Sequence, residues 1–124
     1  MRRFRLGLAV TALAAVAACN TPSVPLPPPD LPSLGFISAG VNLVSAQGKP
    51  STEHSGVRFY VYNISRGDGV ITTAAADGSF TTSPFAGSDG DTVQLYYDTT
   101  SADRSQDVCV ALHVGQPLLS IACR

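Results

Sequence analysis

Three segments of the chain alternate apolar and polar residues with a period of two. Their apolar positions are Val57, Phe59 and Val61 in the first segment, Val93, Leu95 and Tyr97 in the second, and Val108, Val110 and Leu112 in the third. Successive side chains of a β-strand point to opposite faces of a sheet, so this period predicts strands with one buried face. The apolar set is therefore expected to face the core.

Turns rich in Gly, Pro and Asp separate these segments from their neighbours. They lie at Gly48–Pro50, Arg66–Gly69, Asp77–Gly78, Gly87–Asp91 and Gly115–Pro117. Between them the pattern predicts seven strands, at residues 36–45, 56–63, 69–76, 79–85, 92–98, 106–114 and 118–123, and no helix. Short strands joined by such turns indicate an all-β sandwich or small barrel. We predict a single small β-sandwich over residues 34–124.

Four short motifs follow one another within residues 41–98. They are Gly48-Lys49-Pro50, Ser55-Gly56-Val57-Arg58-Phe59, Asp77-Gly78-Ser79-Phe80 and Gly90-Asp91-Thr92-Val93. Together they resemble the carboxypeptidase regulatory-like and related immunoglobulin-like modules of bacterial surface proteins. The resemblance implies an immunoglobulin-like or prealbumin-like strand order, a hairpin turn at Asp77-Gly78 and a core position for Phe80. It also implies a non-catalytic accessory, stalk or adhesive module, and it names no ligand. Ser51–His54 departs from the pattern by lengthening one connection.

The first nineteen residues look like the export signal of a bacterial lipoprotein. Three arginines precede Leu6–Ala18, an uncharged run of thirteen residues. Such a run suits a signal peptide and is shorter than the roughly 20 residues of a membrane-spanning helix. The run ends in Val16-Ala17-Ala18-Cys19, which resembles a lipobox. We therefore predict a signal peptide at residues 1–18 and acylation of Cys19. The alternative is an ordinary signal with a chance cysteine.

A lipobox implies that the mature chain sits in the cell envelope, attached to a membrane by its acyl chains. Asn20 stands where inner-membrane retention favours Asp, so by analogy the outer membrane is the expected destination. Residues 19–33 hold six of the nine prolines. Proline fixes φ and removes a backbone donor, so the segment is expected to be an extended spacer of roughly 40 Å that contributes little to the core. A proline-rich ligand for a partner domain is the alternative.

Charge argues against nucleic acid as a partner. Loss of residues 1–18 removes three of the eight basic residues and none of the nine acidic ones, which leaves a net charge of −4. Nucleic-acid binding relies on neutralising phosphates, so the mature chain has no electrostatic basis for it. It also has no polybasic patch for anionic lipid.

Residues that could carry catalysis or bind a metal are few. His54 and His113 are the two histidines, Glu53 is the single glutamate, and no cysteine spacing suits zinc. The loop aspartates Asp68, Asp77, Asp89 and Asp91 lack the ordered ligands of a calcium loop and are interpreted as turn residues. No nucleophile elbow or phosphate-binding loop is present. We therefore expect no metal, no cofactor and no enzymatic activity.

Tyrosines form the candidate interaction surface. Tyr60 and Tyr62 alternate with the apolar positions of their strand, and Tyr96 does so on another strand. Exposed tyrosines offer flat apolar area with a polar tip, which suits binding. Cross-strand pairing that only stabilises the sheet is the other interpretation.

Two functions remain open on this basis. One is a tethered, non-catalytic sandwich that binds or spaces an envelope protein or another envelope component. The other is a small envelope enzyme or enzyme inhibitor that acts through loops. A concave cluster of His54 with Asp and Tyr side chains would favour the second function.

The two remaining cysteines are expected to form a disulfide. An exported chain meets an oxidising compartment. If residues 106–114 and 118–124 form a hairpin with a three-residue loop at Gly115–Pro117, Cys109 lies directly opposite Cys123. Two buried free thiols are the alternative.

Overall fold

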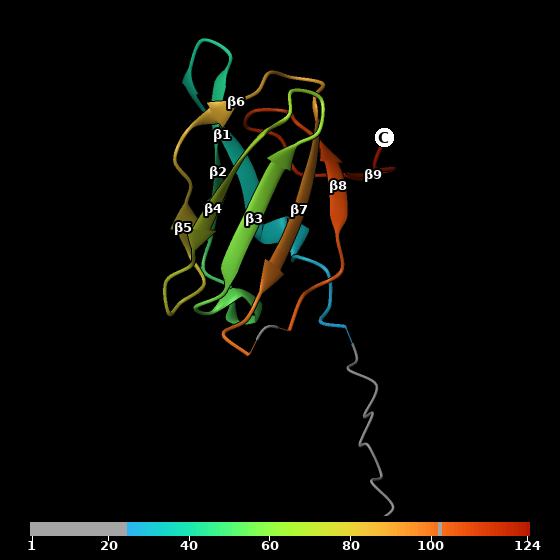
Figure 1. The fold of residues 1–124 in the computed structure, drawn as a ribbon. Helices are drawn as coiled ribbons and strands as arrows, with labels where there is room; N and C mark the ends of the chain where they lie inside the picture. Colours follow the sequence, from blue (N-terminus) through green and yellow to red (C-terminus); the bar gives the residue numbers. More distant parts are fainter. Residues whose placement is uncertain (1–24, 102) are drawn as a thin grey trace, which may run out of the picture.

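Two antiparallel β-sheets pack face to face in the computed structural model, which describes residues 25–101 and 103–124 (Figure 1). The first sheet contains β1 (Leu34–Gly40), β2 (Leu43–Gly48), β5 (Phe80–Thr81) and β6 (Phe85–Ala86). The second has the order β4-β3-β7-β8-β9, formed by β4 (Asp68–Thr73), β3 (Arg58–Asn63), β7 (Thr92–Asp98), β8 (Val108–Ala111) and β9 (Ser120–Ile121). Two short 3-10 turns, η1 (Leu31–Ser33) and η2 (Thr52–His54), lie outside the sheets. The predicted β-sandwich is confirmed.

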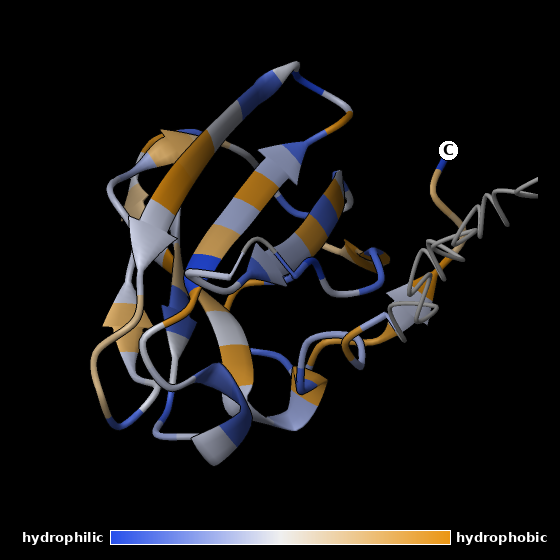
Figure 2. Ribbon diagram, turned by 60° about the horizontal axis from the view of Figure 1, so that its bottom comes forward, coloured by the Kyte–Doolittle hydropathy of each residue, from blue (hydrophilic) through white to orange (hydrophobic). Residues whose placement is uncertain are grey.

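The core contains the side chains that the alternation assigned to it. All nine apolar positions of the three alternating segments are buried or half-buried, and Phe59 is fully buried. Its ring stacks on that of Phe80, with centroids 4.4 Å apart. Figure 2 shows the alternation as bands of opposite hydropathy along the strands. Burial of these side chains is the main force that holds the two sheets together.

The described residues form nine strands rather than seven, because two predicted strands are divided. Residues 36–45 were expected to be one strand, but the chain turns at Gly40–Asn42 and β1 pairs with β2. Asn42 adopts φ 54°, a left-handed conformation that Asn tolerates better than most residues. Residues 79–85 are divided into β5 and β6. Pro84 lies between them, and a proline has no N–H for a ladder.

Asp77-Gly78 forms a turn that joins the two sheets. β4 and β5 do not pair with each other, so the turn is not the hairpin of two paired strands that the resemblance implied. Gly78 has φ 88°, and a Cβ there would lie 2.0 Å from the Ser51 carbonyl oxygen. Only glycine fits this position, and the turn delivers Phe80 to the core as expected.

The C-terminal strands form the predicted disulfide in a different register. Cys109 and Cys123 are bonded, with Cα atoms 5.2 Å apart. Cys109, however, pairs with Ile121 in the ladder, so the predicted alignment is wrong by two residues. The connection is also longer than the expected three-residue loop, because Gly115 donates its N–H to the Phe36 carbonyl of the other sheet.

The N-terminal segment from Pro25 to Ser33 lies on the sandwich. Leu26 and Leu31 pack against the core, and Leu26 forms a parallel bridge with Ser105. The Gln106 N–H donates to the Leu26 carbonyl. For these nine residues the expected free spacer is therefore incorrect, because the leucines between the prolines bury apolar surface. The rest of the predicted spacer, with Cys19 and the signal peptide, lies outside the described residues.

Candidate functional site

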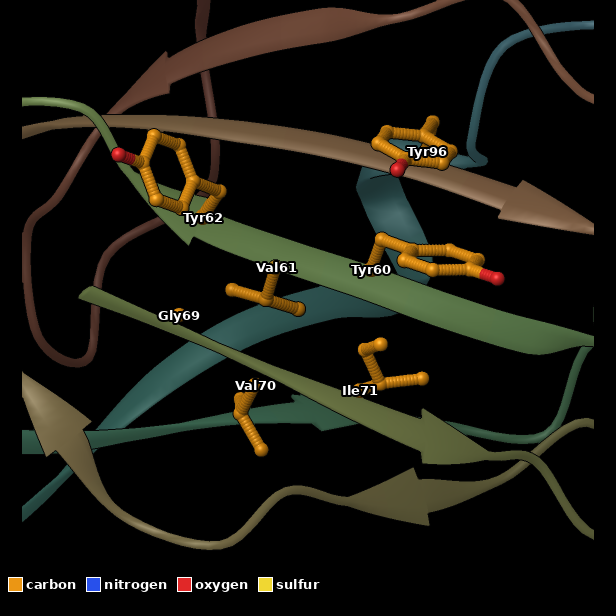
Figure 3. Close-up of a pocket in the computed structure, with 7 residues that line it drawn as sticks. All are labelled: Tyr60, Val61, Tyr62, Gly69, Val70, Ile71 and Tyr96. Carbon is orange, nitrogen blue, oxygen red and sulfur yellow. The ribbon is translucent and has the colours of Figure 1, made fainter. Parts of the chain in front are cut away.

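The tyrosine face consists of Tyr60, Tyr62 and Tyr96 on the outer side of the five-stranded sheet. β3 and β7 pair so that Tyr60 lies directly opposite Tyr96. Their rings stack almost in parallel, with centroids 4.5 Å apart and an angle of 9° between the planes. Figure 3 shows both rings on neighbouring strands, with Tyr62 further along β3. The alternation thus placed all three side chains on the correct face.

An ion pair fixes one end of this face. Arg58 donates from Nε and Nη2 to the two carboxylate oxygens of Asp98, at 3.0 and 2.9 Å. The Tyr60 hydroxyl donates to the same carboxylate at 2.9 Å. The hydrogen bonds from Arg58 lower the pKa of Asp98, so this carboxylate stays charged and continues to accept from the tyrosine. The position of the Tyr60 ring is therefore fixed at its polar tip.

A second cation covers the other end of the stack. The Arg104 guanidinium lies 3.8 Å from the centroid of the Tyr96 ring, which is the geometry of a cation–π contact. Arg104 also pairs with Asp107 at 2.7 Å, and Asp107 accepts from the Gln94 side chain at 2.6 Å. One ring face of Tyr96 is thus covered by Arg104 and the other by Tyr60.

A groove of about 680 Å³ runs beside the stack, over β3 and β4. Tyr60, Tyr62 and Ile71 form its apolar walls, as Figure 3 shows. Gly69 lies opposite Tyr62, and a Cβ at Gly69 would come within 3.0 Å of the Tyr62 ring. The absence of a side chain at Gly69 lets the tyrosine lie close to β4. Tyr62 is 43% exposed and Ile71 is 59% exposed, so apolar area in the groove is available for contact.

The two interpretations of the tyrosines therefore apply to different residues. Tyr60 and Tyr96 form a cross-strand pair whose rings cover each other, which stabilises the sheet. Tyr62 has no such ring partner among the described residues and remains the most exposed of the three. Ile71, which lies directly opposite Tyr60 on β4, was not identified from the sequence. The signal that could have found it is the short Gly-rich turn at Arg66–Gly69, because such a turn between two strands indicates a hairpin and makes β4 the neighbour of β3.

His54 is buried away from this face. It is fully buried in η2, and its Nε2 accepts the N–H of Asp30 at 3.0 Å. Its ring makes edge contacts with Phe59 and Tyr97, and no described residue bonds its Nδ1. Burial lowers the pKa of His54, and the Asp30 carboxylate offsets part of that effect. His54 therefore joins the N-terminal segment to the core. It lies beside Asp30 and Tyr97, but it is fully buried, so these side chains do not form the concave, accessible cluster that would favour an enzyme.

Tyr97 makes a second contact with the N-terminal segment. Its hydroxyl lies 3.0 Å from the Pro27 carbonyl and 3.2 Å from a Glu53 carboxylate oxygen. Burial, and then the charge of Glu53, raise the pKa of Tyr97 to about 12. The phenol thus stays protonated and can donate. Sequence patterns missed this contact because they identify Tyr97 only as a core residue.

The turn aspartates use their carboxylates to hold the loops. Asp68 accepts hydrogen bonds from the N–H groups of Gly69 and Ala86, and Asp77 accepts them from the N–H and hydroxyl groups of Ser79. Asp89 accepts a hydrogen bond from the Val114 N–H. Asp91 accepts hydrogen bonds from the Ser88 N–H and from the side chains of Asn63 and Arg66. Within residues 25–101 and 103–124 no group of three His, Cys, Asp or Glu side chains could hold a metal ion.

No helix in that same part of the chain is long and apolar enough to cross a membrane.

Comparison with known proteins does not assign the chain to a family. No family model, no curated protein and no solved structure matches it. The resemblance to carboxypeptidase regulatory-like modules and the lipobox therefore remain predictions.

Acidification from about pH 7.5 to about pH 5 is expected to lower the free energy of unfolding through His54. The folded chain keeps His54 neutral, whereas the unfolded chain binds a proton below the ordinary pKa of 6.5. This contribution is complete above that pKa and is lost as the pH falls. Urea unfolding across this range should show the slope in wild type and in His113→Gln, but a smaller slope in His54→Gln. Equal slopes in all three would contradict the assignment.

Proposed function

We propose that the mature chain is a membrane-tethered, non-catalytic lipoprotein of the cell envelope. In this proposal Cys19 carries the acyl chains, and the β-sandwich binds an envelope protein or another envelope component through the tyrosine face. The observation that carries the proposal is the exposed apolar groove beside the stacked tyrosines. The resemblance to surface-protein modules points to the same class of function.

The chemistry of the groove supports binding. Its walls combine flat aromatic area with hydroxyl groups, which is typical of interaction surfaces. The ion pair of Arg58 with Asp98 holds the Tyr60 ring in position before any partner arrives. A surface fixed in this way loses less side-chain entropy on binding than a mobile one.

The positions of the titratable groups support a non-catalytic role. General acid–base catalysis requires a side chain within hydrogen-bonding reach of a substrate. His54 is enclosed by the core and the N-terminal segment, and the turn aspartates bond to the chain itself. The groove is lined by tyrosine, aliphatic and glycine residues, which offer no general base with an ordinary pKa near neutrality.

Cys19→Ala is expected to move the protein from the detergent phase to the aqueous phase in a two-phase extraction. The lipobox predicts that the anchor depends on this thiol, because two or more acyl chains are needed for a stable attachment. Ser23→Ala, in the same segment, is the control and should remain in the detergent phase. If wild type and Cys19→Ala partition alike into water, the lipoprotein assignment is wrong.

The binding role is tested by gentle crosslinking in the native envelope, followed by purification of the mature protein. A partner that is captured with wild type should be reduced several-fold with Tyr62→Ser, because this change removes exposed apolar area from the groove. Ile37→Ser, at a comparably exposed position on β1, is the matched control and should capture as much partner as wild type. Equal capture with all three chains would refute a role for the tyrosine face.

A further inference from the structure

We infer that the free edge of β4 pairs with the β4 edge of a second copy of this chain, so that the two five-stranded sheets become continuous across a two-fold axis. This inference is independent of the proposed function. It rests on the backbone of β4, on its residue types and on its position beside the tyrosine face.

The backbone of β4 has hydrogen-bonding groups that point away from β3. The Ala74 N–H donates to the Val57 carbonyl, which fixes the phase of the ladder between the two strands. Bonded pairs recur every second residue, so Gly69, Ile71 and Thr73 direct their N–H and C=O groups to the open side. Gly69 fits this phase, because its N–H bonds to the side chain of Asp68 rather than to β3. Within the described residues, the N–H groups of Ile71 and Thr73 have no hydrogen-bond partner.

The same edge lies open to solvent. Val70 and Thr72 point inward, yet they remain half-exposed, whereas the inward residues of β3 are buried. Segment β5–β6 lies near β4 but pairs with β2 in the other sheet. Exposed edges normally carry Lys, Pro or a bulge that prevents pairing. From Gly69 to Thr73 the edge has none of these.

The residue types of β4 are compatible with pairing to the same edge of a second copy. In an antiparallel alignment centred on Ile71, each Ile71 faces the other, each Gly69 faces Thr73, and each Val70 faces Thr72. Asp68 is the single charge of the strand. It lies at the end, so the two Asp68 side chains are at opposite ends of the pairing and do not repel each other. Pairs of β-branched residues across a ladder are favourable.

Pairing would also extend the apolar row of the outer face. Tyr96, Tyr60 and Ile71 lie side by side on β7, β3 and β4. A second copy continues this row with its own Ile71 and tyrosines, and it covers the side chain that is 59% exposed in the single chain. The Ile71 N–H and C=O groups of both copies then form two bonds, and each Thr73 N–H can donate to a Gly69 carbonyl. A contact of one strand on each side is small, so the dimer is expected to dissociate in the micromolar range.

Disulfide trapping tests the alignment on a chain of residues 20–124. Ile71→Cys should form a linked dimer under mild oxidation, because Cα atoms of directly opposed residues are about 5.5 Å apart, within the range of a disulfide. Thr73→Cys, two residues along the same exposed strand, is the matched control. Its two copies would lie about 13 Å apart along the strands and should not link. Linking that is no more efficient at position 71 than at position 73 would overturn the proposed pairing.

Sedimentation velocity provides an independent measurement without new cysteines. Wild type should shift from monomer toward dimer as its concentration rises through the micromolar range, and Ile71→Lys should remain monomeric because it places two like charges opposite each other. Ile37→Lys, on β1 of the other sheet, should behave like wild type. A wild type that stays monomeric up to about 1 mM, or an Ile71→Lys chain that associates as wild type does, would refute the dimer.

Discussion

Loss of the Cys109–Cys123 disulfide is expected to lower the free energy of unfolding by about 3 kcal/mol and Tm by roughly 15 °C. The bond closes a loop whose ends are 14 residues apart. It restricts the unfolded chain, and it also fixes a short strand, because β9 contributes only two residues to the sheet. Cys109 pairs with Gln94, and both side chains point to the outer face of the sheet. Cys109 is nevertheless only 1% exposed. The C-terminal segment therefore shields this part of the sheet.

Thermal unfolding of the Cys109→Ala, Cys123→Ala double variant measures this effect. Wild type kept reduced, without alkylation, is the control and should unfold at nearly the same temperature as the double variant. Hydrogen exchange should increase in residues 118–124, where few backbone bonds remain once the covalent bond is absent. A double variant that unfolds within about 2 °C of oxidised wild type would contradict the structural role of the bond.

Removal of Pro25–Pro32 is expected to lower the free energy of unfolding by about 2 kcal/mol and Tm by roughly 10 °C. Leu26 and Leu31 lose the apolar surface that they bury against the sandwich. His54 loses the Asp30 N–H that bonds to its Nε2, and Tyr97 loses the Pro27 carbonyl. Removal of a segment that served only as a spacer would change neither the free energy of unfolding nor Tm.

The comparison is between a chain that begins at Pro25 and a chain that begins at Ser33. Leu26→Ser in the longer chain should reproduce part of the loss, whereas Pro28→Ser, at an exposed position of the same segment, should not. If the two chains unfold at the same temperature, the N-terminal segment is not part of the folded domain.

The alternation of apolar and polar residues predicts which face of a sheet each side chain occupies, but it does not predict which strands pair. It placed Tyr60, Tyr62 and Tyr96 outside and Phe59 inside, because the period of a strand is a local property of the backbone. The stacking of Tyr60 on Tyr96 depends on β3 pairing with β7, which are about thirty residues apart in the sequence. No local pattern encodes that register. Ile71 differs in this respect, since the short Gly-rich turn at Arg66–Gly69 is a local signal that β4 pairs with β3 as a hairpin.

The N-terminal segment and the C-terminal hairpin also differ from the sequence-based expectations, and in both the signal lies in leucine residues. The segment of residues 19–33 was expected to be an extended spacer because it holds six prolines, which have no N–H for a sheet. Its two leucines, Leu26 and Leu31, are the sequence signal that it binds the domain. In the C-terminal hairpin, both Leu112 and Leu118 are buried, so the chain between them must cross the side of the sandwich. That constraint lengthens the loop and shifts the ladder by two residues.

Site-specific photocrosslinking in intact cells tests the binding role of the tyrosine face most directly. A photoreactive residue replaces Tyr62 in one chain and Ile37, on the outer side of the other sheet, in a second chain. We predict a discrete crosslinked product from position 62 that is absent from position 37. If the partner is another protein, the mass of this product differs from that of two copies of this chain. Equal labelling from both positions, or no product from position 62, would contradict a binding role for this face.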